Sequence, residues 1–134
     1  MTEQCASSGT EFALRPAPPR RAAEARAAAK AFVAQLNPAP SARTAQNLLL
    51  LSSELVTNAI RHAGAVTTLA FEADSGALRV RVGDPDPAPP RSRVPDMTGR
   101  TGGFGWPMIL QLAKKVTVRP LRGEGKIIVA VLAR

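Results

Sequence analysis

Residues 53–63 have the sequence SELVTNAIRHA and form the second half of a segment whose apolar spacing predicts an amphipathic helix. Glu54 and Asn58 are four residues apart, so in a helix their side chains project from the same face. A carboxylate and an amide carbonyl are oxygen ligands suited to Mg²⁺, and a carboxylate can also act as a base toward a hydroxyl group or water. The alternative, which this motif alone leaves open, is that both residues belong to the solvated side of the helix.

The sequence around this motif changes between helical and strand patterns. Residues 18–36 are rich in alanine and open with proline, which predicts a first helix. The prolines of residues 37–41 end it, Ser41 is placed to cap the second helix, and Gly64 ends that helix after His62. Further apolar patterns predict a third helix at 106–115 and strands at 66–73, 77–84, 115–120 and 126–133.

This order of elements predicts an α+β fold, a two-layer sandwich in which helices pack on one face of a mostly antiparallel sheet. The length of 134 residues suits one domain. We expect a flexible tail at 1–12, in which Phe12 can begin a short leading strand with Leu14, and the domain itself at 13–134. Residues 85–105 are crowded with proline and glycine and are too long for a simple connection, which predicts a lid loop.

Asp84 ends the strand predicted at 77–84 and is in phase with the apolar residues Leu78, Val80 and Val82. An acid in phase with core residues is expected to point inward, where a carboxylate is costly unless it accepts hydrogen bonds. The amino group of adenine is a suitable donor. The alternative is an aspartate that only caps the turn before Pro85.

Residues 99–109, GRTGGFGWPMI, form a glycine-rich segment that runs directly into the third predicted helix. Gly102, Gly103 and Gly105 allow backbone amides to approach phosphate groups, and the start of a helix adds a favourable dipole. A flexible hinge is the alternative. The segment is neither a Walker loop nor a dinucleotide-binding fingerprint, because it lacks the residues that define them.

The composition limits the classes of function. The longest apolar run is far shorter than a membrane span, and the N-terminus lacks a signal pattern, so we expect a cytoplasmic protein without membrane contact. The formal net charge of +8 suits nucleic acid, an acidic partner or a phosphate-bearing ligand. Because the basic residues are dispersed and aromatic residues make up only 4%, direct nucleic-acid binding is disfavoured.

Taken together, in this order and spacing, the three stretches resemble the histidine-kinase-like (GHKL, Bergerat-fold) ATPase domains, especially small actinobacterial ATP-binding regulators and anti-sigma factor serine kinases. The resemblance covers nearly the whole chain and implies ATP and Mg²⁺ as cofactors. It implies that Glu54 is the catalytic acid, that Asn58 holds Mg²⁺ against the phosphates, and that Asp84 binds the adenine amino group.

The resemblance also implies that a lid arginine, Arg100, lies near the terminal phosphate. The run that matches the family's second glycine box, which wraps the phosphates, is Gly102, Gly103, Phe104, Gly105 and Trp106. Two positions depart from the family pattern. Residues 84–88 are DPDPA in place of a D-x-G-x-G sequence, and Lys126 stands after Gly123-Glu124-Gly125 where many members have threonine. These departures indicate altered adenine contact and a weaker nucleotide affinity.

The function implied by the resemblance is that of an ATP-dependent protein serine/threonine kinase that binds and regulates a partner protein. The expected partners are a sigma factor and an anti-anti-sigma (STAS-type) protein, and pairing with a second copy of the chain stays open. A non-catalytic protein-binding module that uses ATP structurally, or not at all, is the alternative function.

Overall fold

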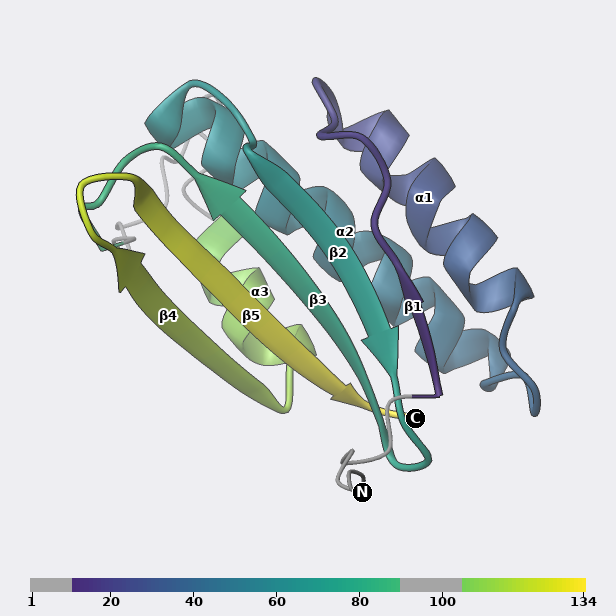
Figure 1. Cartoon of the computed structure of the whole chain (residues 1–134). Helices are drawn as coiled ribbons and strands as arrows, with labels where there is room; N and C mark the ends of the chain where they lie inside the picture. The colour runs from purple at the N-terminus through teal and green to yellow at the C-terminus, as the bar shows by residue number, and fades with distance from the viewer. Residues whose placement is uncertain (1–10, 90–104) are drawn as a thin grey trace, which may run out of the picture.

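The computed structural model describes residues 11–89 and 105–134. Within these residues the strands form one sheet in the order β1-β2-β3-β5-β4, and every neighbouring pair is antiparallel. Figure 1 shows the helices on one face of this sheet, which confirms the predicted two-layer α+β sandwich. The elements in chain order are β1 (Phe12–Leu14), α1 (Ala22–Ala34), α2 (Ala42–Ala63), β2 (Thr68–Ala73), β3 (Ala77–Asp84), α3 (Gly105–Leu112), β4 (Lys115–Leu121) and β5 (Gly125–Ala133).

Both ends of α2 are capped as the sequence predicts. The Ser41 Oγ accepts a hydrogen bond from the Thr44 backbone N–H at 3.1 Å. At the other end Gly64 has φ 85°, a left-handed conformation that glycine adopts at little cost, and its N–H donates to the Ile60 carbonyl. The long helix presents a continuous apolar stripe to the sheet, made of Leu48, Leu51, Leu55, Val56 and Ala59.

Several element boundaries differ from those predicted. α1 begins at Ala22, later than the predicted start at residue 18, because Arg21 is extended with φ −148°. The Glu24 carboxylate accepts a hydrogen bond from the Arg20 N–H at 2.7 Å and fixes this start. α3 ends at Leu112, because β4 already begins at Lys115. The leading strand β1 is present and begins at Phe12, the last residue of the segment expected to be a tail.

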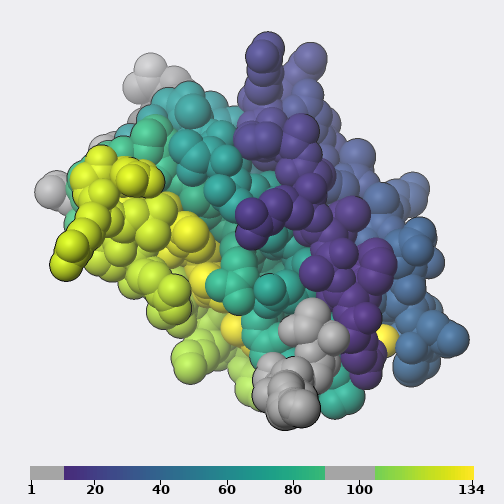
Figure 2. All heavy atoms as spheres, in the orientation of Figure 1, coloured from purple at the N-terminus to yellow at the C-terminus, as the bar shows by residue number. Residues whose placement is uncertain are grey.

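The hydrophobic core fills the space between the helices and the sheet. Phe32 of α1 stacks between Phe12 of β1 and Phe71 of β2, with ring centroids 5.7 Å and 5.2 Å away. No helix of the described residues lies over the opposite face of the sheet, and the strands make up much of the surface seen in Figure 2. None of the helices within residues 11–89 and 105–134 combines the length and apolar character needed to span a membrane.

Candidate functional site

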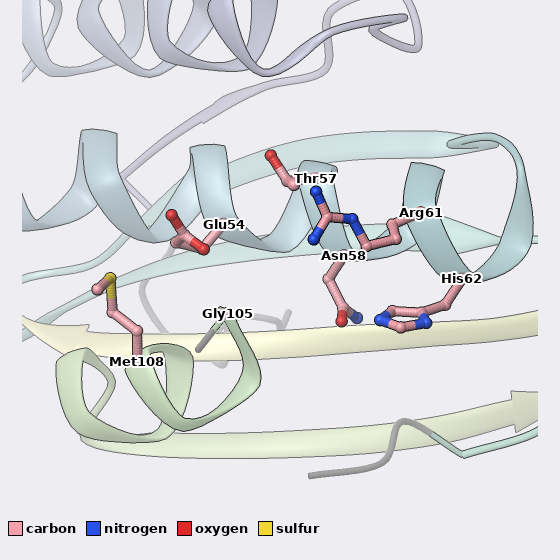
Figure 3. Close-up of a pocket in the computed structure, with 7 residues that line it drawn as sticks. All are labelled: Glu54, Thr57, Asn58, Arg61, His62, Gly105 and Met108. Atoms are coloured by element: carbon pink, nitrogen blue, oxygen red, sulfur yellow. The ribbon is translucent and has the colours of Figure 1, made fainter. Parts of the chain in front are cut away.

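A pocket of about 280 Å³ lies between α2 and the beginning of α3. Figure 3 shows its lining side chains: Asn58 and His62 project from α2 on the side of α3, whereas Thr57 points away from α3. The α2 members are spaced at i, i+3, i+4, i+7 and i+8, which places them on one stripe of the helix. The lining residues are Glu54, Thr57, Asn58, Arg61, His62, Gly105 and Met108.

Glycine at position 105 allows the start of α3 to approach the carboxylate of Glu54. A Cβ atom added to Gly105 would lie 3.2 Å from the Glu54 Oε1, which is closer than an ordinary van der Waals contact. The fully buried Ile109, one turn further along α3, anchors this short helix in the core. Gly105 therefore lies next to the acid of the second helix, and the approach of the glycine-rich segment to phosphate groups stays a prediction.

Glu54 is half-buried, and its protonation is perturbed. Loss of solvation on burial raises the pKa of the Glu54 carboxyl, and the positive charge of Arg61 partly opposes this by lowering it. A carboxylate with a raised pKa holds a proton more readily at a given pH. This is the direction expected for a group that accepts a proton during a reaction.

Asn58 is buried, with an exposed fraction of 9%, and it lines the same pocket. Within the described part of the chain no hydrogen bond to another residue involves its side-chain amide. Buried polar groups are normally hydrogen-bonded, so an amide that faces a pocket in this state is suited to a ligand, a metal ion or water. Its side-chain carbonyl oxygen is a ligand of the type that Mg²⁺ binds.

The described residues contain no cluster of three or more His, Cys, Asp or Glu side chains that could hold a metal ion. Glu54 and Asn58 alone do not fill the coordination sphere of a metal ion. Mg²⁺ characteristically uses one or two protein ligands and takes the others from phosphate and water. The residues present therefore fit Mg²⁺ that arrives with a phosphate-bearing ligand.

Asp84 is buried, with an exposed fraction of 1%, at the end of β3. Lys126 is its cross-strand partner on β5, and the Lys126 Nζ donates to the Asp84 Oδ1 at 3.1 Å. The same ammonium donates to the Asp86 carbonyl at 2.8 Å, and the Asp86 N–H donates to the Asp84 Oδ1 at 2.9 Å. The inward orientation predicted for Asp84 is observed, and its hydrogen-bond donors come from the protein.

Gly125 explains how the ends of β3 and β5 come so close. It has φ 98°, and a Cβ atom at this position would collide with the Asp84 carbonyl oxygen and the Cα atom of Pro85. Only glycine fits both the conformation and the space. The residue before Lys126 thus fixes the lysine beside the carboxylate.

The structure brings together some of the predicted site residues. Glu54, Asn58 and Gly105 line one pocket. Asp84 and Trp106 do not line it: Asp84 is paired with Lys126, and Trp106 packs against the hydrophobic core. Most of the expected lid loop lies outside the described residues, together with four of the predicted site residues, namely Arg100, Gly102, Gly103 and Phe104.

The sequence analysis assigned no role at the site to Arg61, His62, Thr57 or Met108, which complete the pocket. The first two could have been identified by extending the helical spacing by one turn beyond Asn58. The pairing of Lys126 with Asp84 was also missed. Its signal is that Lys126 is in phase with the buried residues Ile128, Ala130 and Leu132, as Asp84 is with its own strand.

Comparison with known proteins identifies the family of the chain. Residues 15–132 match the model of the histidine kinase-like ATPase domain. A search of curated proteins found no match. Since the match extends over almost the entire chain, including α2, the pocket and the Asp84–Lys126 pair, this protein belongs to the histidine kinase-like ATPase domain family, whose domains bind ATP.

Proposed function

We propose that this chain is an ATP- and Mg²⁺-dependent protein serine kinase of the anti-sigma factor type, which binds and regulates a partner protein in the cytoplasm. The observation that carries the proposal is the pocket between α2 and α3, in which a carboxylate with a raised pKa, a buried amide and a glycine at a helix start meet. Each group suits one part of a phosphoryl-transfer site.

In the proposed reaction the oxygen of a substrate serine attacks the γ-phosphorus of ATP. The bond between the γ-phosphorus and the bridging oxygen breaks, ADP leaves, and Glu54 accepts the proton of the hydroxyl group. The Glu54 carboxylate is suited to this role by its raised pKa and its position on the pocket wall. Transfer of this kind depends mainly on positioning and on neutralising phosphate charge.

Two further lining residues support binding of the phosphates. Asn58 would hold Mg²⁺ through its side-chain oxygen, and the ion would neutralise phosphate charge when bound. Arg61 adds positive charge to the same wall. The formal net charge of +8 acts over longer range and favours any anionic ligand.

The proposed partners are a sigma factor and an anti-anti-sigma protein of the STAS type, in line with the resemblance to anti-sigma factor kinases. A non-catalytic module that works by protein contact is the second candidate. The engagement of Asp84 by Lys126 favours it, because the internal ammonium takes a carboxylate that a nucleotide base would otherwise use.

The test is transfer of labelled γ-phosphate from ATP, with Mg²⁺, to purified sigma and STAS-type proteins. We expect the wild type to label serine and Glu54→Gln to be slower by about 100-fold or more, the usual contribution of a positioned base. Glu124→Gln, in the exposed turn between β4 and β5, is the matched control and should match the wild type. Equal transfer by wild type and Glu54→Gln would remove the role of Glu54. Calorimetric binding of ATP with no transfer to any substrate would select the non-catalytic module.

A further inference from the structure

The Asp84–Lys126 pair is part of the inner face of the sheet. Both residues are in phase with buried apolar residues of their strands, and they face the helical layer that also carries the pocket. Their exposed fractions are 1% and 4%, so water is almost excluded from the pair. Among the described residues Asp84 is the only buried carboxylate.

The hydrogen bonds of the pair are supplied from within the chain. The Asp84 Oδ1 accepts from the Lys126 Nζ and from the Asp86 N–H, at 3.1 Å and 2.9 Å. The ammonium also donates to the Asp86 carbonyl, and the Asp86 Oδ1 accepts from the Ala88 N–H at 2.9 Å. The backbone of residues 84–88 is therefore folded over the lysine by two successive aspartate turns.

A nucleotide base that donated an amino group to Asp84 would have to compete with this ammonium. The Lys126 ammonium carries a charge opposite to that of the carboxylate, and this adds a Coulomb attraction that a neutral amino group lacks, so the internal donor has the advantage. Lys126 also cancels the negative charge of Asp84, which further weakens the attraction for a donor.

The size of the pocket also indicates that the phosphates and the base of a nucleotide would lie at different places. Its volume of about 280 Å³ lies at or below the lower limit for a site that encloses a whole drug-sized ligand. Its walls carry a carboxylate, an amide and an arginine, which suit phosphate and Mg²⁺ more than an aromatic base. A base would extend beyond it, and the buried carboxylate available for its amino group, that of Asp84, already accepts two hydrogen bonds from within the chain through its Oδ1.

We infer that Lys126 is a specificity-determining residue, which competes with the nucleotide base for the carboxylate of Asp84. As a result the chain holds a nucleoside triphosphate mainly by its phosphates and discriminates weakly between bases. This inference rests on the proposed triphosphate site at Glu54 and Asn58. It concerns only the base end of the ligand.

The first experiment measures binding of ATP, GTP and inorganic tripolyphosphate, each with Mg²⁺, to the full-length wild type by calorimetry. We expect the dissociation constants of ATP and GTP to agree within about threefold, which corresponds to less than the gain from one hydrogen bond. An ATP preference of tenfold or more would overturn the inference and leave the proposed function standing. No binding of any of the three by folded protein would overturn the proposed function together with the inference.

The second experiment uses Lys126→Thr, which frees the carboxylate and leaves a small polar side chain. We expect ATP to bind about tenfold tighter relative to GTP than in the wild type, the gain of about one hydrogen bond. Adding Asp84→Asn to this variant should abolish the gain. Lys115→Thr, the same change at an exposed position of β4, should leave the ratio unchanged.

Circular dichroism checks that each variant is folded before binding is measured. A folded Lys126→Thr protein with the wild-type ratio of ATP to GTP affinity would overturn the inference. Should that variant fail to fold, the wild-type comparison of the three ligands decides the question alone.

Discussion

Replacing Lys126 with methionine removes the ammonium group and keeps an unbranched side chain of similar length. The variant loses the bonds from the Lys126 Nζ to the Asp84 Oδ1 at 3.1 Å and to the Asp86 carbonyl at 2.8 Å. It leaves the Asp84 carboxylate, 1% exposed, with the Asp86 N–H as its donor among the described residues. We expect a large loss of stability, because the remaining charge is buried without its partner.

The magnitude follows from the burial of the pair. Removing one partner of a buried ion pair costs about 3–5 kcal/mol, and a chain of this length has a total unfolding free energy of about 7–20 kcal/mol. At about 4 °C per kcal/mol, the melting temperature should fall by about 12–20 °C. Lys115→Met, an exposed lysine on β4, is the control and should change stability by about 0.5 kcal/mol or less.

Urea unfolding measures this effect through Trp106, the only tryptophan of the chain, which packs partly buried against the core. The double variant Asp84→Asn/Lys126→Met removes both charges while the asparagine can still accept the Asp86 N–H. We expect it to be more stable than Lys126→Met alone, with a coupling energy of about 2 kcal/mol. Strictly additive losses in the two single variants would refute the reasoning that the charges depend on each other.

Two further perturbations test the site and its frame. Burial raises the pKa of Glu54 in the folded state, so protonated Glu54 favours folding at acidic pH, and this contribution is lost as the pH rises through the folded pKa. The free energy of unfolding of Glu54→Gln should therefore be higher than that of the wild type by about 0.5 kcal/mol at pH 7. In urea titrations this difference should shrink toward pH 4. An unchanged difference across that range would contradict the assigned burial effect. Gly125→Ala should lower the free energy of unfolding by about 3 kcal/mol or more in the same assay, since its Cβ meets backbone atoms of Asp84 and Pro85. Gly123→Ala, with φ 61° and open space around it, should lower it by about 1 kcal/mol. Equal losses would show that the close approach at Gly125 is relieved easily.

The sequence predicts the helices and strands well where local chemistry fixes them. Ser41 and Gly64 cap α2 through interactions with neighbouring residues, and the alternation from Leu78 to Asp84 defines β3, so these elements are where they are expected. The predicted start of α1 is wrong by four residues, because composition alone does not show that Arg21 is extended.

The site is predictable only to the extent that it lies on one element. Glu54 and Asn58 share a helix face, and their spacing alone places them together. The partner of Asp84 is 42 residues away in sequence, and it became its neighbour because β5 inserts between β3 and β4. The alternation of β5 shows that Lys126 faces inward, but strand order is a property of the whole chain, so no local pattern could show that Asp84 is its neighbour.

The short length of α3 has a consequence for how a bound ligand would change the molecule. A helix of eight residues is too short to be stable in isolation, and of its residues only Ile109 is buried. Its order therefore depends on its contact with α2, and local opening of this turn should be among the cheapest fluctuations in the domain. A ligand that contacts Glu54 and Gly105 bridges α2 and α3. Amide hydrogen exchange in α3 should therefore slow as the fraction of protein with bound ligand rises. This exchange reports ligand binding even where no reaction follows.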